Sequence, residues 1–141
     1  MSTASAALVA LTFTWLGLVL GISFIEAPLK FRAPNVTLQI GLGIGRLVFR
    51  ALNTVEMVIA LAMLVLLLSD HQPARATTFL VIAFVCLADQ VILVRPSLAR
   101  RSDAVLAGED GGRSTAHYFY VGAELTKVVA LILGGAFVLA G

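Results

Sequence analysis

Apolar residues occur in four long stretches along this chain, and short polar segments separate them. The stretches extend over about residues 5–27, 42–68, 77–94 and 115–139. A membrane-spanning helix needs about 20 predominantly apolar residues, so each stretch is long enough to cross a bilayer once. The pattern predicts an all-α, integral membrane four-helix bundle that forms a single domain over residues 1–141.

Prolines and polar residues set the expected ends of these spans. Pro28 closes the first stretch and Pro96 follows the third, because proline lacks the backbone N–H that a continuing helix requires. Asn35 is the expected N-cap of the second span, which then begins between residues 36 and 47. Residues 97–114 form the only long polar loop that the pattern predicts, and its glycines make it flexible.

Basic residues are distributed unequally between the two ends of the predicted bundle. Arg75 is the only one at the end that holds the termini. The opposite end has Lys30, Arg32, Arg95, Arg100, Arg101 and Arg113. Loops rich in Lys and Arg stay in the cytoplasm, so both termini are expected to be non-cytoplasmic. The chain is thus predicted to be a multi-pass protein of the inner (plasma) membrane.

The composition agrees with a protein whose solvent is lipid. Apolar residues make up 60% of the chain and charged residues 13%, with a mean hydropathy of +1.00. The net charge of +2 comes from basic residues that flank apolar stretches, which is typical of membrane topology, so no nucleic-acid partner is expected. Cys86 is the only cysteine, which excludes an internal disulfide.

Each predicted span carries one carboxylate, namely Glu26, Glu56, Asp89 or Glu124. At 1.5 Å per residue, Glu56 and Asp89 each lie about 18 Å from the outer ends of their spans. Glu124 has a depth similar to that of Asp89, whereas Glu26 falls at the cytoplasmic edge. A charged side chain near the bilayer centre costs about 2.5–3.5 kcal/mol, so these groups are expected to face one another or a wet cavity.

Other polar residues at neighbouring heights enlarge this candidate site. They are Arg46, Arg50, Asn53, Gln90, His117 and Lys127. We expect the site to open toward the cytoplasm and to bind a small ligand, an ion or a lipid head group. The pattern assigns no catalytic residue and no cofactor. A salt-bridge network that only fixes helix register, as in an assembly subunit, explains the same residues.

Histidine placement restricts the metal chemistry. Bis-histidine haem needs two facing histidines, but His71 and His117 belong to opposite ends of the bundle. The Glu-x-x-His pairs of di-iron bundles do not occur. No metal centre is expected, and a single ion held by Glu56, Asp89, Glu124 and His117 stays as an alternative.

Two pairs of glycines have the spacing that lets membrane helices approach closely. They are Gly17-x-x-x-Gly21 in the first span and Gly41-x-x-x-Gly45 in the second. Packing within the bundle and contact between copies in a homo-oligomer both explain this spacing. Membrane lipid is the other expected partner.

The segment Arg50-Ala51-Leu52-Asn53-Thr54-Val55-Glu56 is similar to the Arg-Ala-x-x-Asn-x-x-Glu stretch of the membrane-associated eicosanoid and glutathione metabolism enzymes. Those enzymes are four-span proteins of about this size, and the match here is one residue short. The resemblance implies a glutathione-dependent or lipid-modifying enzyme that seats its cosubstrate on Arg50, Asn53 and Glu56. Whether the chain is an enzyme stays open.

A second set of motifs involves the first, third and fourth spans. It consists of Phe24-x-x-Ala27-Pro28-x-x-Phe31, Asp89-Gln90 before Arg95-Pro96, and His117 followed by Glu124-x-x-Lys127. Together these motifs resemble uncharacterised small bacterial four-span integral membrane proteins. That resemblance implies the same architecture and no particular activity.

Overall fold

The computed structural model describes residues 1–94, 96, 100, 103 and 115–141. In this part of the chain, four helices are long and apolar enough to cross a membrane. They are Thr3–Lys30, Leu38–Ser69, Ala74–Leu93 and Tyr118–Ala140. The prediction of an all-helical fold with four helices long and apolar enough to span a membrane is therefore confirmed for these residues. Apart from Arg100 and Asp103, the expected loop at 97–114 lies outside the described residues.

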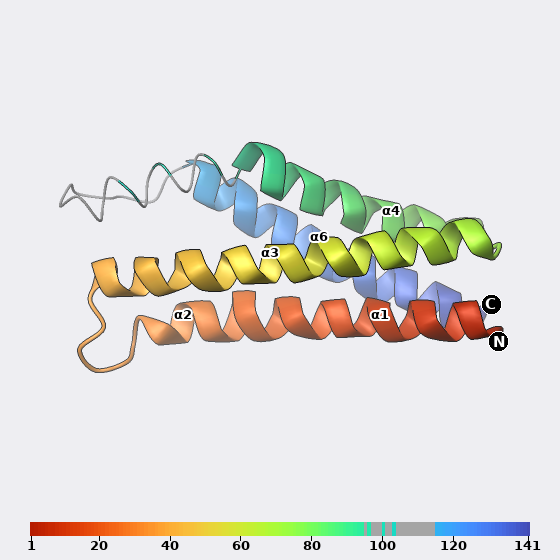
Figure 1. Cartoon of the computed structure of the whole chain (residues 1–141), viewed down its shortest axis with the longest axis horizontal. Coiled ribbons are helices and arrows are strands. Elements are labelled where there is room, and N and C mark those ends of the chain that lie inside the picture. Colours follow the sequence, from red (N-terminus) through yellow and green to blue (C-terminus); the bar gives the residue numbers. More distant parts are fainter. Residues whose placement is uncertain (95, 97–99, 101–102, 104–114) are drawn as a thin grey trace.

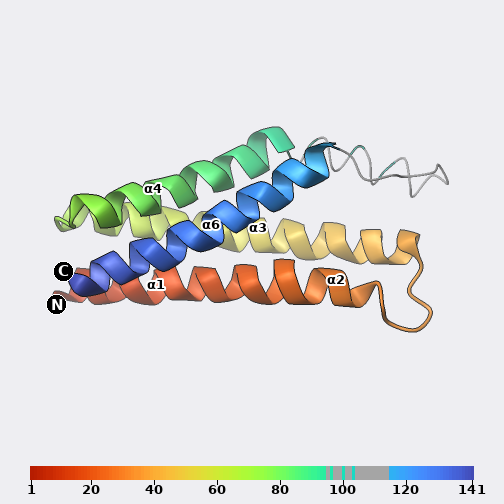
Figure 2. The ribbon, with the colours of Figure 1, turned by 180° about the vertical axis from the view of Figure 1, so that it is seen from behind.

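The principal helices are α1 (Thr3–Val19), α3 (Leu38–Ser69), α4 (Ala74–Asp89) and α6 (Thr115–Ala140). Helix α6 packs most extensively against α4 and also against α1, whereas α3 touches α1 more than α4. Both termini lie at one end of the bundle, as an even number of spans requires (Figure 1). Toward the opposite end, here called the loop end, α4 and α6 diverge from α1 and α3 (Figures 1 and 2).

The first span does not stop at Pro28, contrary to the expectation from the sequence. It continues through the π-helical segment η1 (Leu20–Glu26) into α2 (Ala27–Lys30). Proline removes one helical hydrogen bond and crowds the carbonyl four residues earlier. In η1 the pairing is shifted by one residue, so that Ala27 N–H donates to the Ile22 carbonyl, and the helix can include the proline. A second π-helical segment, η2 (Gln90–Val94), precedes Pro96 in the third span.

The capping residue of α3 and the first residue of α4 also differ from the sequence prediction, although α3 begins within the expected range. Thr37 caps α3 in place of Asn35, and its hydroxyl oxygen accepts a hydrogen bond from Ile40 N–H at 3.1 Å. Asn35 has a φ of 66°, a left-handed conformation that asparagine tolerates in turns. Helix α4 begins at Ala74 instead of residue 77, so Arg75 lies in its first turn.

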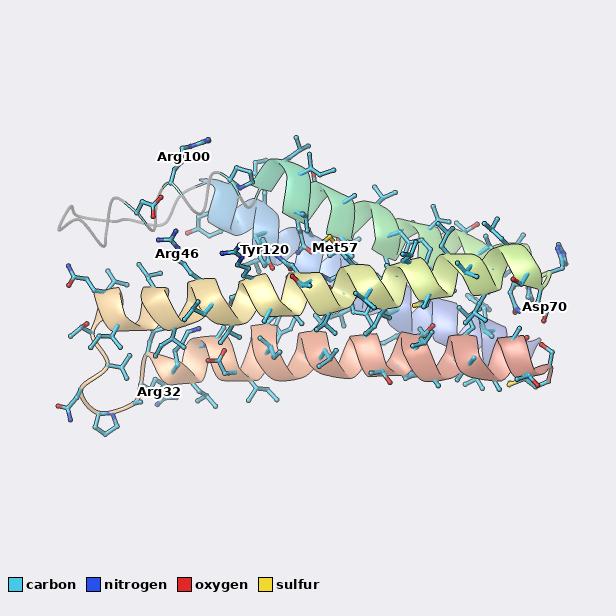
Figure 3. The ribbon with its side chains drawn as sticks, viewed as in Figure 1. Arg32, Arg46, Met57, Asp70, Arg100 and Tyr120 are labelled. Carbon is cyan, nitrogen blue, oxygen red and sulfur yellow. The ribbon has the colours of Figure 1, made fainter. Side chains whose placement is uncertain are left out.

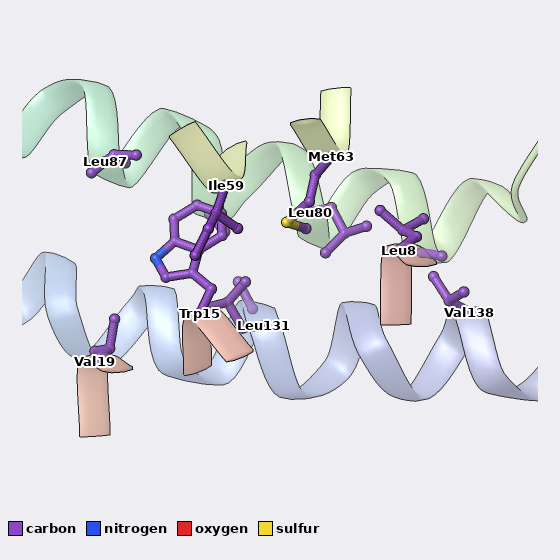
Figure 4. Close-up of a cluster of buried hydrophobic side chains, with 12 residues drawn as sticks. Leu8, Trp15, Val19, Ile59, Met63, Leu80, Leu87, Leu131 and Val138 are labelled. Atoms are coloured by element: carbon purple, nitrogen blue, oxygen red, sulfur yellow. The ribbon is translucent and has the colours of Figure 1, made fainter. Parts of the chain in front are cut away.

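Buried side chains recur every three or four residues on each helix, which forms one inward-facing stripe per span. The stripes contain Leu8, Thr12, Trp15 and Val19 on α1, then Asn53, Glu56, Ile59 and Met63 on α3, Ala76, Leu80, Ala83, Leu87 and Gln90 through α4 and η2, and Tyr120, Glu124, Lys127, Leu131 and Val138 on α6. Most apolar members pack together between Trp15 and the termini, while Val19 and Leu87 lie on the loop-end side of Trp15 (Figure 4). Charged members lie toward the loop end.

Hydrogen bonds close the end of the bundle that holds the termini. The Ser2 hydroxyl caps α1 by accepting from Ser5 N–H at 3.0 Å and donates to an Asp70 carboxylate oxygen at 2.5 Å. The Gln72 amide donates to the Ser5 hydroxyl at 2.9 Å. The turn between α3 and α4 is thereby joined to the start of α1.

The glycine pairs differ in their surroundings. Gly41 packs against the ring of Phe31, and a Cβ at Gly45 would lie 3.1 Å from Lys30 Nζ, so this second pair serves packing within the chain. A Cβ at Gly17 or Gly21 would meet nothing within 4 Å in the described chain. The first pair therefore lies on an open face of α1.

Gly135 lets α6 approach α1 closely, so we expect Gly135→Leu to lower the free energy of unfolding. A Cβ at this position would lie 2.7 Å from the Phe13 ring and 3.2 Å from the Thr12 methyl group. Overpacking of this kind typically costs about 1–3 kcal/mol. The measurement is thermal unfolding in detergent. Gly122→Leu on the same helix is the control, because a Cβ there meets nothing within 4 Å. Equal melting temperatures for the two variants would contradict the predicted packing.

Candidate functional site

Lys127 is the centre of a charged cluster inside the bundle. Its Nζ lies 2.5 Å from Glu56 Oε2 on α3 and 2.5 Å from Glu124 Oε1 on α6. It also donates to Gln90 Oε1 in η2 at 2.8 Å. Each of these four residues is at most 2% exposed. Together with Trp15 and Asn53, described next, they are called the polar cluster.

Trp15 brings α1 into the cluster. Its indole N–H donates to Glu56 Oε2 at 2.6 Å, so one carboxylate oxygen accepts from both the indole and Lys127. The Gln90 amide donates to Glu124 Oε1 at 2.7 Å and to the Tyr120 carbonyl at 3.3 Å. All four spans thus supply side chains to one network. Sequence analysis missed Trp15, although the three- and four-residue spacing of Leu8, Thr12, Trp15 and Val19 places it on the buried stripe of its helix.

Asn53 is buried beside this network without a hydrogen-bond partner. It is 1% exposed, and neither its Oδ1 nor its Nδ2 is bonded within the described chain. Glu56 Oε1 and Glu124 Oε2 also have no partner there. Asn53 and Glu56 are three residues apart on α3 and therefore share a helix face. Buried polar groups in proteins are almost always hydrogen-bonded, so this concentration of unpartnered atoms requires an explanation.

The two ends of the polar cluster differ. Toward the termini, the Trp15 and Phe84 rings stack with centroids 6.0 Å apart, and the apolar core follows. Toward the loop end, Phe49 and Tyr120 meet edge to face with centroids 5.8 Å apart. Tyr120 lies between α3 and the α4–α6 pair, where the helices begin to diverge (Figure 3). Phe49 and Tyr120 therefore border the cluster on its loop-end side.

Asp89 does not join the polar cluster, although its height along the span agrees with that of Gln90. It is half-buried and makes no ion pair or hydrogen bond within the described residues. Consecutive helical residues point about 100° apart, so Asp89 cannot face the same centre when Gln90 does. His117 belongs to α6, but its side chain lies outside the part of the structure that is described.

Three other predicted site residues also lie away from the cluster. Arg46 is exposed and pairs with Asp103 at 2.6 Å. Glu26 pairs with Lys30 at 3.6 Å, one turn along the first span. The Arg50 side chain is exposed and has no hydrogen bond or ion pair in the described chain, whereas Asn53 and Glu56 are buried. The three residues of the resemblance therefore differ in exposure, and glutathione binding by them stays a prediction.

Metal coordination receives no support from the described residues. Among them, no group of three or more His, Cys, Asp and Glu is placed to hold a metal ion. The alternative single-ion site would require Asp89, which lies outside the cluster.

Comparisons of the chain with protein-family models, curated proteins and solved structures found no match. The class of this protein is therefore described from its fold and its site alone. Its described residues form four helices long and apolar enough to cross a membrane, and these helices enclose a hydrogen-bonded, charged cluster to which each of them contributes.

Proposed function

We propose that this chain is a multi-pass protein of the inner (plasma) membrane whose polar cluster binds a small ligand, an ion or a lipid head group. The loop end faces the cytoplasm and both termini are non-cytoplasmic, because Lys30, Arg32, Arg46 and Arg50 belong to the loop end and only Arg75 to the other. The ligand enters from the cytoplasmic side, past Phe49 and Tyr120.

The buried and unpartnered Asn53 is the observation that carries this proposal. A network that only fixed helix register would be expected to satisfy its members, because an unpaired buried amide destabilises the fold by about 1–3 kcal/mol. Asn53, Glu56 Oε1 and Glu124 Oε2 instead retain hydrogen-bonding capacity within the described chain. A ligand that contacts these atoms would supply the hydrogen bonds that the protein alone does not.

Neutral substitutions of the two glutamates test the proposal. We expect Glu56→Gln and Glu124→Gln to insert into the membrane and elute as the parent protein does, but to lose the molecule that native mass spectrometry detects with it. Each change keeps the side-chain volume and removes one carboxylate that faces Lys127.

Glu26→Gln is the matched control, because Glu26 lies outside the cluster and pairs with Lys30. It should retain the bound molecule. If the cluster variants lose expression and insertion to the same extent as they lose binding, the cluster serves register alone and the proposal is wrong.

A further inference from the structure

We infer, building on the proposed function, that the polar cluster binds one monovalent cation. Its oxygen ligands are Glu56 Oε1, Glu124 Oε2 and Asn53 Oδ1, which are the buried acceptors of this cluster without a partner in the described chain. The cation is an alkali metal ion or a small ammonium compound, since the two share a single positive charge and an affinity for oxygen ligands.

The charge of the cluster is the first argument. Glu56 and Glu124 contribute two negative charges and Lys127 contributes one positive charge, whereas Trp15, Gln90 and Asn53 are neutral. All of these side chains are buried, so the cluster carries one uncompensated negative charge in a medium of low dielectric constant. Such a charge is strongly unfavourable inside a membrane protein unless a counter-charge accompanies it. One positive charge restores neutrality.

The number of unpartnered atoms distinguishes a cation from a proton. A proton on one carboxyl group would satisfy that oxygen and one acceptor, and would leave the third oxygen and the Asn53 amide N–H groups without partners. A cation coordinates several oxygens at once. A water molecule in its hydration shell could also accept a hydrogen bond from Asn53 Nδ2.

Charge and coordination number disfavour a divalent ion. Two positive charges would leave the cluster with a net positive charge. Calcium and magnesium also take six or more oxygen ligands, and magnesium retains several waters. Only Glu56 and Glu124 are carboxylates of the cluster, and the described residues hold no group of three acidic, histidine or cysteine side chains placed for a metal.

The single tryptophan of the chain provides a direct probe of binding. The Trp15 indole donates to Glu56, so its fluorescence reports on the carboxylate that would hold the cation. The purified full chain in detergent is titrated separately with sodium, potassium and methylammonium chloride. N-methyl-D-glucamine chloride keeps the ionic strength constant. We expect a saturable change in fluorescence and a rise in melting temperature with at least one of the three cations.

Two variants test the assignment of the ligands. Glu124→Gln makes the cluster neutral and should weaken the cation response at least tenfold. Asn53→Ala leaves the charge unchanged and removes one oxygen ligand, and it should also weaken the response at least tenfold. Because the Asn53 side chain has no hydrogen bond in the described chain, this change breaks no internal hydrogen bond. Glu26→Gln should respond as the parent protein does.

The outcomes separate this inference from the proposed function. A saturable response that both variants lose supports the cation site, and the effective salt identifies alkali ion or ammonium. Absence of any saturable response, which a permanently protonated glutamate would produce, overturns it, as does an equal response in Glu124→Gln. If native mass spectrometry finds a neutral or anionic molecule with the protein, the cation inference is overturned, but the proposed ligand site is still supported. If neither bound molecule nor ion response is found, both fail.

Discussion

Lys127→Met is expected to destabilise the folded protein by about 3–5 kcal/mol, because it leaves two carboxylates buried without their counter-ion. Lys127 Nζ is the shared partner of Glu56 and Glu124, and its side chain is fully buried. Methionine fits a similar volume but contributes neither charge nor a hydrogen-bond donor. The measurement is thermal or denaturant-induced unfolding followed by Trp15 fluorescence, which reports on the same network.

If buried charge causes the loss of stability, neutralising the two glutamates in the same variant should reverse it. Glu56→Gln and Glu124→Gln added to Lys127→Met should recover most of the lost stability, since the triple variant buries no charge at these positions. The effects of the three changes are therefore strongly non-additive. Lys30→Met is the control, since Lys30 forms a longer ion pair, at 3.6 Å, with the partly exposed Glu26, and its loss should cost less than the loss of Lys127. A loss for Lys127→Met as small as that of the control would contradict the expected energetics.

The architecture could be predicted because membrane helices require length and hydrophobicity, and both are visible in a single sequence. Heights along the spans could be predicted as well, since a helix rises 1.5 Å per residue. The contacts of Lys127 with Glu56 and Glu124 agree with the common level expected for these residues. Height alone does not determine which way a side chain points.

Helix rotation explains the differences in the candidate site. Asp89 and Gln90 have almost the same height, but the buried stripe Ala76, Leu80, Ala83 and Leu87 continues to Gln90. That periodicity is present in the sequence, and it would have favoured Gln90 over Asp89 as the residue that faces the interior. The same reasoning identifies Trp15, which follows Leu8 and Thr12 on the stripe of α1. A count of charged residues misses such neutral hydrogen-bond donors.

Other features require the assembled structure. The π-helical segments before Pro28 and Pro96 depend on how each span compensates for the backbone N–H that proline lacks. Hydropathy does not show this compensation. The role of Gly135 becomes clear only when Phe13 is placed against it. An unpartnered Asn53 is likewise a property of its neighbours, because any residue of the right height could have bonded to it.

Asn53→Leu is expected to stabilise the empty protein and to abolish its response to ligand. The side chain is buried and makes no hydrogen bond within the described residues, so leucine, an apolar side chain with the same branched arrangement of heavy atoms, removes a desolvation penalty of about 1–3 kcal/mol. Sites that keep such a penalty are typical of binding, where function and stability compete. The melting temperature should rise without added cation, and the cation-induced shift should disappear.

Thr54→Leu provides the matched control on the neighbouring, exposed position, where the hydroxyl bonds only to the Arg50 carbonyl. It should change stability by less than about 0.5 kcal/mol and keep the ligand response. A lower stability for Asn53→Leu would mean that the amide is satisfied in the folded protein, and it would remove the main support for a ligand site. If Asn53→Leu gains stability and loses binding, the unpaired amide of Asn53 serves to bind the ligand, because no other role accounts for both effects at once.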